Sequence, residues 1–203
     1  MSGNNELDPV LDDLAELAPA GYFVGLHIRF AAPLLTFQTY DRRWLDHYTE
    51  QAYALRDPII AWGFAAEGVS RWSEITIPDP FGILRQAAEY GLKYGVVVSC
   101  GPIRSRTIAG ASRNDREFEA SEMDRVGRLV ARLHELTEPP EKLTRAQADA
   151  LRLIAAGDRH AAAAAKLGIS ESALKARLTA ARERLMARTT AEAIQRARDY
   201  GLL

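Results

Sequence analysis

Apolar positions near the start of the chain change from helical to strand-like spacing. Residues 6–18 place leucines and a valine three or four positions apart, which predicts an amphipathic helix. Segments 22–30 and 33–40 are rich in aromatic and β-branched residues and follow turn formers, so each predicts a strand. A helix is expected over 41–55, and Asp57-Pro58 begins a further short one, because proline fits the first helical turn.

Similar changes of spacing continue through the middle of the chain. Residues 70–80 are dense in turn formers and predict a loop, whereas residues 81–94 predict a helix that ends at Gly95. Two short runs of small and β-branched residues, 96–101 and 106–112, predict two more strands joined by a short connector.

One long helix completes the first part of the chain. Asn114 is its expected N-cap, and its apolar stripe reaches about His134. Four or five strands with helices on both faces make an α/β/α sandwich, so the predicted fold class is α+β, with an all-α part after it.

The end of the chain has only helical patterns and predicts a domain of four helices over residues 143–203. Within it, residues 161–178 hold one short helix, the turn Leu-Gly-Ile-Ser and a second, more basic helix, which is typical of a helix-turn-helix. Two prolines in Glu138–Glu141 cannot continue a helix. We therefore expect a linker over residues 138–142 between a sensing domain, 1–137, and a DNA-binding domain.

Charge separates the two parts of the chain. The formal net charge is −1, but residues 143–203 hold 11 Lys and Arg against 6 Asp and Glu, whereas residues 1–142 hold 15 against 21. A basic part behind an acidic part fits a nucleic-acid reader joined to a domain that does not bind nucleic acid. Ordinary surface variation is the alternative explanation.

The remaining composition excludes several classes of protein. Cys100 is the only cysteine, so no intramolecular disulfide forms, and it is expected to be a buried structural thiol. No apolar run approaches the roughly 20 residues of a membrane span, and no signal peptide is apparent, so we expect a cytoplasmic protein with no membrane contact. His27, His47, His134 and His160 are scattered, and no metal spacing or nucleophile motif occurs; we expect no enzyme, no metal and no cofactor.

Two groups of residues resemble the LuxR family of quorum-sensing transcriptional regulators. The first combines rare residue types at matched spacing: Tyr40, Trp44, Tyr48, Asp57-Pro58 and Trp72. A Gly-x-x-x-Pro strand of that family corresponds here to Gly95–Ser99, where the proline is absent. The second group lies in the C-terminal part and consists of Leu143-Thr144, Leu151, Gly157, Ala164, Leu167–Ser170, Lys175, Leu178, Ala191–Ala193 and Gly201–Leu203.

The resemblance implies a buried site for an acyl-homoserine lactone in the first domain. It implies that Trp44 donates its indole N–H to the lactone carbonyl, that Asp57 accepts the ligand amide, and that Tyr40 or Tyr48 bonds a carbonyl. Trp72 would line the head-group end, and Ser112 could add a hydroxyl. Core packing of the aromatic rings and helix capping by Asp57 are the alternative roles of these residues.

The resemblance also implies that the chain binds double-stranded DNA through a recognition helix over about 170–186. Ser170 would cap that helix, Lys175 and Arg177 would contact phosphate or bases, and Arg182 and Arg184 would contact the backbone. A solvated basic helix face is the alternative.

Several positions depart from the family pattern. Gln147 replaces a Glu, Ala161 a Lys, Ala163 a core Ile and Ala173 a Thr. Losing an Ile-sized group from a core costs about 2–5 kcal/mol, unless the helices pack closer on the small side chains. Either way, we expect DNA affinity to be lower than is usual for the family.

Two partnerships remain open from the sequence. The leading hypothesis is a homodimer on DNA, with the apolar faces of 118–133 and 191–200 as candidate contacts, although both faces could equally pack within one subunit. The alternative is an orphan or weakly DNA-binding member that antagonises a related regulator by forming a heterodimer with it.

Overall fold

The computed structural model describes residues 4–28, 32–138 and 143–203. The chain divides into two compact units, residues 1–138 and residues 139–203. Within the described ranges, none of the helices has both the length and the apolar character needed to cross a bilayer.

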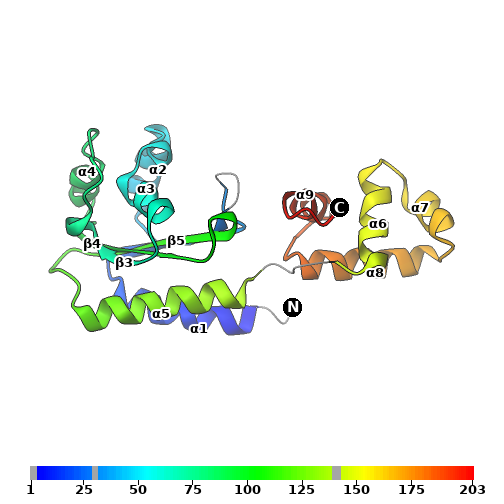
Figure 1. Ribbon diagram of the computed structural model, residues 1–203, viewed down its shortest axis with the longest axis horizontal. Helices are drawn as coiled ribbons and strands as arrows, with labels where there is room; N and C mark the ends of the chain where they lie inside the picture. The colour runs from blue at the N-terminus through cyan, green and yellow to red at the C-terminus, as the bar shows by residue number, and fades with distance from the viewer. Residues whose placement is uncertain (1–3, 29–31, 139–142) are drawn as a thin grey trace. The chain divides into compact units, whose positions relative to one another are not determined.

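Unit 1 is built on a five-stranded antiparallel sheet in the order β2-β1-β5-β4-β3 (Figure 1). The central strand β5 therefore pairs with β1, which is distant in sequence, on one side and with β4, the preceding strand, on the other. The strands are β1 (Gly21–Ile28), β2 (Leu35–Gln38), β3 (Gly68–Arg71), β4 (Tyr94–Cys100) and β5 (Arg106–Arg113).

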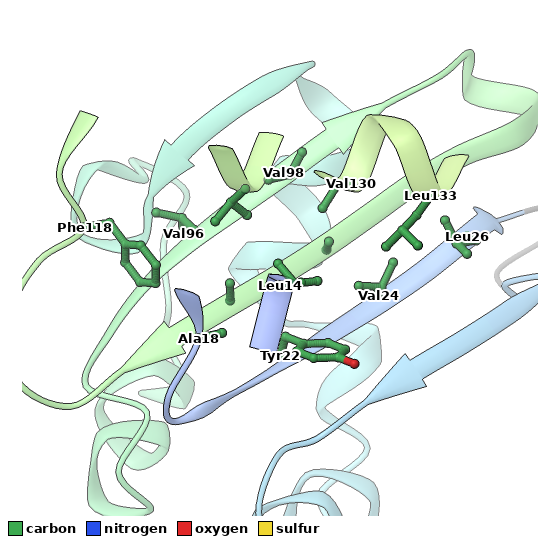
Figure 2. Close-up of a cluster of buried hydrophobic side chains, with 13 residues drawn as sticks. Leu14, Ala18, Tyr22, Val24, Leu26, Val96, Val98, Phe118, Val130 and Leu133 are labelled. Atoms are coloured by element: carbon green, nitrogen blue, oxygen red, sulfur yellow. The ribbon is translucent and has the colours of Figure 1, made fainter. Parts of the chain in front are cut away.

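One face of the sheet packs on two long helices, α1 (Asn4–Leu17) and α5 (Ala120–Leu136). Figure 2 shows the buried side chains between these layers, where Leu14 and Val130 meet strand residues such as Val24 and Val96. The alternation of the strands sends every second side chain into this core and the others toward the opposite face.

The opposite face carries the shorter helices α2, α3 and α4 (Figure 1). Unit 1 is thus a sheet between two helical layers, and the α+β fold class is confirmed. This layer consists of α2 (Arg42–Glu50), α3 (Pro58–Ala65) and α4 (Ile83–Glu89), with 3-10 turns η1 (Tyr53–Leu55), η2 (Trp72–Glu74) and η3 (Ile103–Ser105) in the connections.

Four local predictions for unit 1 are wrong. The helix expected over 41–55 ends at Glu50, because Ala52 adopts a positive φ of 51°, and residues 53–55 form the 3-10 turn η1. The expected loop 70–80 begins with strand β3, which pairs with β4 at the sheet edge. Helix α4 ends at Glu89 rather than near Gly95, because Gly91 adopts a positive φ of 90° that breaks the helix. Glu119, not Asn114, is the N-cap of α5, where it forms a capping box with Glu122.

Unit 2 contains four helices in its described part: α6 (Arg145–Ala155), α7 (His160–Leu167), α8 (Glu171–Arg184) and α9 (Thr190–Asp199). Gly168 ends α7 in the left-handed region with a φ of 64°, and Ser170 caps α8. The core of this unit is made largely of alanine and leucine, among them Ala150, Leu151, Ala163, Ala164, Leu174, Leu178 and Ala181. Residues 139–142 of the predicted linker lie outside the described residues.

Candidate ligand-binding cavity

A cavity of about 260 Å³ lies between the sheet and the layer of α2, α3 and α4. The sheet contributes residues of β1, β2 and β5, and the helices close the other side. Its lining is mostly apolar and consists of Phe23, Gln38, Tyr40, Trp44, Leu45, Tyr48, Thr49, Ala54, Asp57, Ile59, Ile60, Trp72, Ile83, Leu84, Ala87, Leu92, Ile108 and Gly110.

Five of the six residues proposed from the sequence line this cavity: Tyr40, Trp44, Tyr48, Asp57 and Trp72. Trp44 and Tyr48 are one turn apart on α2, and their ring centroids lie 5.6 Å from each other at 65°. The sixth, Ser112, is fully buried on β5 and is not part of the lining; its hydroxyl donates a hydrogen bond to the carbonyl of Gly21 at 3.1 Å.

Asp57 both caps helix α3 and lines the cavity. One carboxylate oxygen accepts the backbone N–H of Ile59 at 2.7 Å, which caps α3, and the other accepts the hydroxyl of Tyr48 at 2.7 Å. Burial raises the pKa of Asp57, and the hydrogen bonds from Tyr48 and the backbone oppose that rise. A carboxylate has about four acceptor sites, so capacity remains for a donor in the cavity.

The two tyrosines stay neutral hydroxyl groups in this site. Burial, and then the charge of Asp57, raises the pKa of Tyr48 well above its ordinary value. Burial likewise raises the pKa of Tyr40, whose hydroxyl donates to the carbonyl of Gly110 at 3.1 Å. Both side chains therefore keep their proton near neutral pH.

Trp72 packs directly on the sheet because the residue beneath its ring is a glycine. Its indole ring covers Gly95 on β4, where an added Cβ would overlap the ring. The indole Nε1 is buried and has no acceptor among the described residues. A buried N–H without an acceptor costs about 1–3 kcal/mol, so this donor is a group that a ligand oxygen could satisfy after a small adjustment.

Ser99 stands on β4 where the family pattern has a proline, and its side chain bonds to a neighbouring helix. Its buried hydroxyl donates to the carbonyl of Gly63 on α3 at 2.6 Å. This bond ties β4 to the helix that follows Asp57. Gly63 itself approaches Ile108 of the cavity lining so closely that an added Cβ would lie 2.7 Å from that side chain.

Trp44 packs against a group of rings that the sequence analysis missed; they lie on α2, on η1 and directly after α4. The centroid of the Trp44 ring system lies 5.4 Å from that of Tyr90, 6.3 Å from that of Tyr53 and 6.0 Å from that of His47. None of these three residues lines the cavity. Aromatic residues at helical spacing are common in cores, so sequence carries no signal that separates this supporting group from the lining.

The residues proposed to contact DNA all lie on or next to α8 in unit 2. The Ser170 hydroxyl accepts the backbone N–H of Ala173 at 3.2 Å and caps the helix. Lys175 is exposed and Arg177 is half-buried, whereas Arg182 donates to the hydroxyl of Thr179 at 3.0 Å. Arg184 is exposed as well.

These basic residues divide into two pairs on the helix. At 100° per residue, Lys175 and Arg182 project from one flank of the buried Leu174–Leu178 face, and Arg177 and Arg184 project from the other. The two pairs therefore lie on opposite flanks of α8.

Two observations concern metal binding and thiol chemistry among the described residues. No group of three or more His, Cys, Asp or Glu there is placed to hold a metal ion. Burial raises the pKa of the Cys100 thiol to about 11, which makes it a poor nucleophile.

The cavity lies within the part of the chain that matches a known family. Residues 23–136 match the autoinducer binding domain. This chain belongs to the autoinducer-binding domain family. Among curated protein sequences, no match to the chain is found.

Solved structures share this fold at low sequence identity. Escherichia coli SdiA matches with a TM-score of 0.54 and 20% identity over 97% of this chain and 91% of its own. SdiA in complex with octanoyl-rac-glycerol matches with a TM-score of 0.53 and 18% identity over 98% of this chain and 89% of its own. Burkholderia cenocepacia CepR2, an N-acylhomoserine lactone dependent LuxR family transcription factor, matches with a TM-score of 0.50 and 20% identity over 64% of this chain and 80% of its own.

Proposed function

We propose that this protein is a ligand-responsive transcriptional regulator of the LuxR quorum-sensing type. It binds an acyl-homoserine lactone, or a similar small acyl molecule, in the cavity of unit 1 and binds double-stranded DNA as a dimer through unit 2. The observation that carries the proposal is the cavity itself, in which a few polar groups interrupt an apolar lining. Such a composition suits an amphiphile with a small polar head.

The polar groups match the hydrogen-bonding needs of an acyl lactone. Asp57 accepts the amide N–H of the ligand, and the indole N–H of Trp44 donates to the lactone carbonyl. The unpartnered Trp72 Nε1 adds a second indole donor for an oxygen. An acylglycerol, as found in the SdiA complex, offers hydroxyl donors and ester acceptors to the same groups, so it is the second ligand class to test.

The DNA-binding half of the proposal rests on α8 and its cap. Lys175 and Arg177 are the proposed contacts to phosphate or base edges, with Arg182 and Arg184 as backbone contacts. A homodimer would present two such helices to half-sites about one helical turn apart.

Two measurements test the proposal on the full chain. Titration calorimetry with N-octanoyl homoserine lactone is expected to show saturable binding that Asp57→Asn weakens at least tenfold, because the amide keeps an oxygen to cap α3 but supplies a weaker acceptor. Gel shift at stated salt is expected to show binding that changes with lactone. A folded protein that binds neither the lactone nor DNA above background would contradict the proposal.

The antagonist hypothesis is favoured by one observation, the exposure of Ala161 near the start of α7, where the family has a lysine. If the native reader is weakened by this loss, Ala161→Lys raises DNA affinity sharply in the same gel shift. An unchanged affinity would remove the basis of the hypothesis.

A further inference from the structure

Gln86 lies on α4 outside the cavity lining, and its side-chain amide touches three other segments. Its Oε1 accepts the hydroxyl of Tyr53 at 2.8 Å and faces His47 Nε2 at 2.9 Å. Its Nε2 donates to the backbone carbonyl of Phe81 at 2.9 Å. One amide therefore joins α2, η1, α4 and the segment that precedes α4.

The hydrogen-bond partners determine which end of the Gln86 amide is oxygen and which is nitrogen. The Phe81 carbonyl can only accept a hydrogen bond, so the NH₂ group has to face it and the oxygen has to face Tyr53 and His47. The oxygen in turn accepts only. Neutral His47 must then carry its ring proton on Nε2, because that nitrogen faces an acceptor.

The same segments supply one wall of the cavity. Helix α2 contributes Trp44 and Tyr48, η1 contributes Ala54, and α4 contributes Leu84 and other lining residues. Tyr53 and His47, the two groups that donate to Gln86, both pack on the Trp44 ring. His47 also stacks on Tyr90 with centroids 5.6 Å apart and planes 23° apart.

We propose that Gln86 is a positioning residue for the ligand site: its amide locks α2, η1 and α4 together and thereby fixes the orientation of the Trp44 indole. The inference rests on the proposed function for its ligand and on the hydrogen bonds above for its geometry. Gln86 touches no ligand in this proposal and acts through Tyr53, His47 and Trp44.

The test compares Gln86→Met, Gln86→Glu and Glu89→Ala in the full chain. Methionine keeps the length of the side chain and removes both hydrogen-bonding groups, whereas glutamate keeps the acceptor for Tyr53 and His47. Glu89 is exposed on the same helix and serves as the matched control. The readouts are the Kd for N-octanoyl homoserine lactone and for octanoyl-rac-glycerol, the melting temperature, and the ¹⁵N shifts of His47 and of the Trp44 indole.

We expect Gln86→Met to raise the Kd about tenfold, to shift the Trp44 indole signal and to mix the His47 tautomers, because all three hydrogen bonds of the amide are lost. Gln86→Glu is expected to restore part of the affinity, because it keeps the acceptor for Tyr53 and His47 but loses the donor to the Phe81 carbonyl. Glu89→Ala is expected to behave as the wild type. A merely structural role predicts a lower melting temperature in Gln86→Met with the Kd and the indole signal unchanged.

Two results would overturn the inference: wild-type His47 with its proton on Nδ1, or Gln86→Met with an unmoved Trp44 indole signal. If the wild type binds neither probe while the His47 tautomer and the Trp44 response are as expected, the proposed ligand class fails and the positioning role stands. The NMR arm therefore decides the geometry independently of the ligand.

Discussion

Gly95 and Gly110 each lie against an aromatic side chain of the cavity lining: Gly95 against Trp72 and Gly110 against Tyr40. An added Cβ at Gly95 would overlap the Trp72 ring, and one at Gly110 would lie 3.1 Å from the Tyr40 hydroxyl. Neither glycine has a positive φ, so it is the space they leave, and not backbone freedom, that these positions require.

Gly95→Ala is expected to destabilise the protein by about 1–3 kcal/mol, the usual cost of overpacking a fitted site. The cost comes from displacement of Trp72, because a fused ring cannot move aside as the end of a flexible chain can. Urea denaturation measures the change. In a Trp72→Leu background the same substitution should cost less, and an equal cost in both backgrounds would show that the ring is not the obstacle.

His27 is a buried residue whose surroundings favour a neutral ring. It sits at the irregularity between Gly25 and Ile28 of β1 with a φ of 52°. Its Nε2 faces the carbonyl of His134 at 3.0 Å, so Nε2 carries the proton, and its Nδ1 accepts the hydroxyl of Ser105 at 2.9 Å. Burial, followed by the nearby His134, lowers the pKa of His27 to about 4.

Stability is therefore expected to fall as pH drops from about 6.5 toward 4. The unfolded chain binds a proton at His27 near its ordinary pKa of 6.5, whereas the folded chain does so only near 4, so acid favours unfolding across that window. Burial also lowers the pKa of His134, against the opposing charges of Glu138 and Glu135. Urea midpoints at pH 7.5 and pH 5 measure the effect.

The control for this pH dependence is His27→Asn, because asparagine tolerates a left-handed backbone and does not titrate. That variant should lose much of the difference between the two pH values. A wild-type midpoint that is the same at pH 5 as at pH 7.5 would contradict the assignment of a neutral, buried His27.

Helix α7 holds two of the alanines, Ala161 and Ala163, at which the sequence departs from the LuxR resemblance. Ala163 and Ala164 are buried against α6 and α8 in the core of unit 2. Ala163→Ile is expected to destabilise unit 2 by about 1–3 kcal/mol, because a full side chain would be forced into an interface closed by alanine. Ala161→Lys, at an exposed position, should change stability by less than about 0.5 kcal/mol.

Denaturation of the two α7 variants distinguishes the alternatives that the sequence leaves open. A higher stability of Ala163→Ile would mean that alanine leaves an unfilled space between the helices. The destabilisation expected here would mean that the helices already pack closely on their small side chains.

Elements with strong periodicity were predictable, whereas short edge elements were not. The spacing of leucines predicts α1, and the capping of α8 by Ser170 is visible in the sequence. Strand β3 is four residues long and lacks a clean alternation, so it exists because β4 offers it hydrogen bonds. Propensity alone misplaced the cap of α5 at Asn114, because Glu122 selects Glu119 instead.

Among the side chains in and around the cavity, some were likewise predictable from the sequence and others were not. Five lining residues were predictable because a family pattern marks them jointly: Tyr40, Trp44, Tyr48, Asp57 and Trp72. Gln86 was not, since a polar residue on a helix has no sequence signature for a partner 39 residues earlier, His47, or 33 earlier, Tyr53. Only the packing of α2, η1 and α4 brings those donors to one oxygen.

The whole chain separates an acidic unit from a basic one. This asymmetry supports the proposal that unit 2 contacts phosphate, and it makes the proposed DNA affinity depend on salt. Lys175→Ala is expected to weaken binding at low salt by several-fold and to reduce the slope of log K against log salt by about one, whichever DNA sequence is used. Gel shifts at three salt concentrations measure both quantities.

A matched variant for that measurement is Arg145→Ala, which removes a positive charge that is also exposed, from α6 in the same unit. It should leave the salt slope nearly unchanged. Equal effects of the two substitutions would indicate a diffuse attraction rather than contact through α8.

The measurement that bears most directly on the proposed sensor is thermal melting of the full chain against acyl-homoserine lactones of increasing tail length. A ligand at about 100 times its Kd stabilises the folded state by about 2.7 kcal/mol, which raises the melting temperature by several degrees. We predict a rise that peaks at one tail length, set by the cavity, and that Asp57→Asn largely removes. A folded protein whose melting temperature does not move with any lactone would contradict the proposal that this cavity senses an acyl lactone.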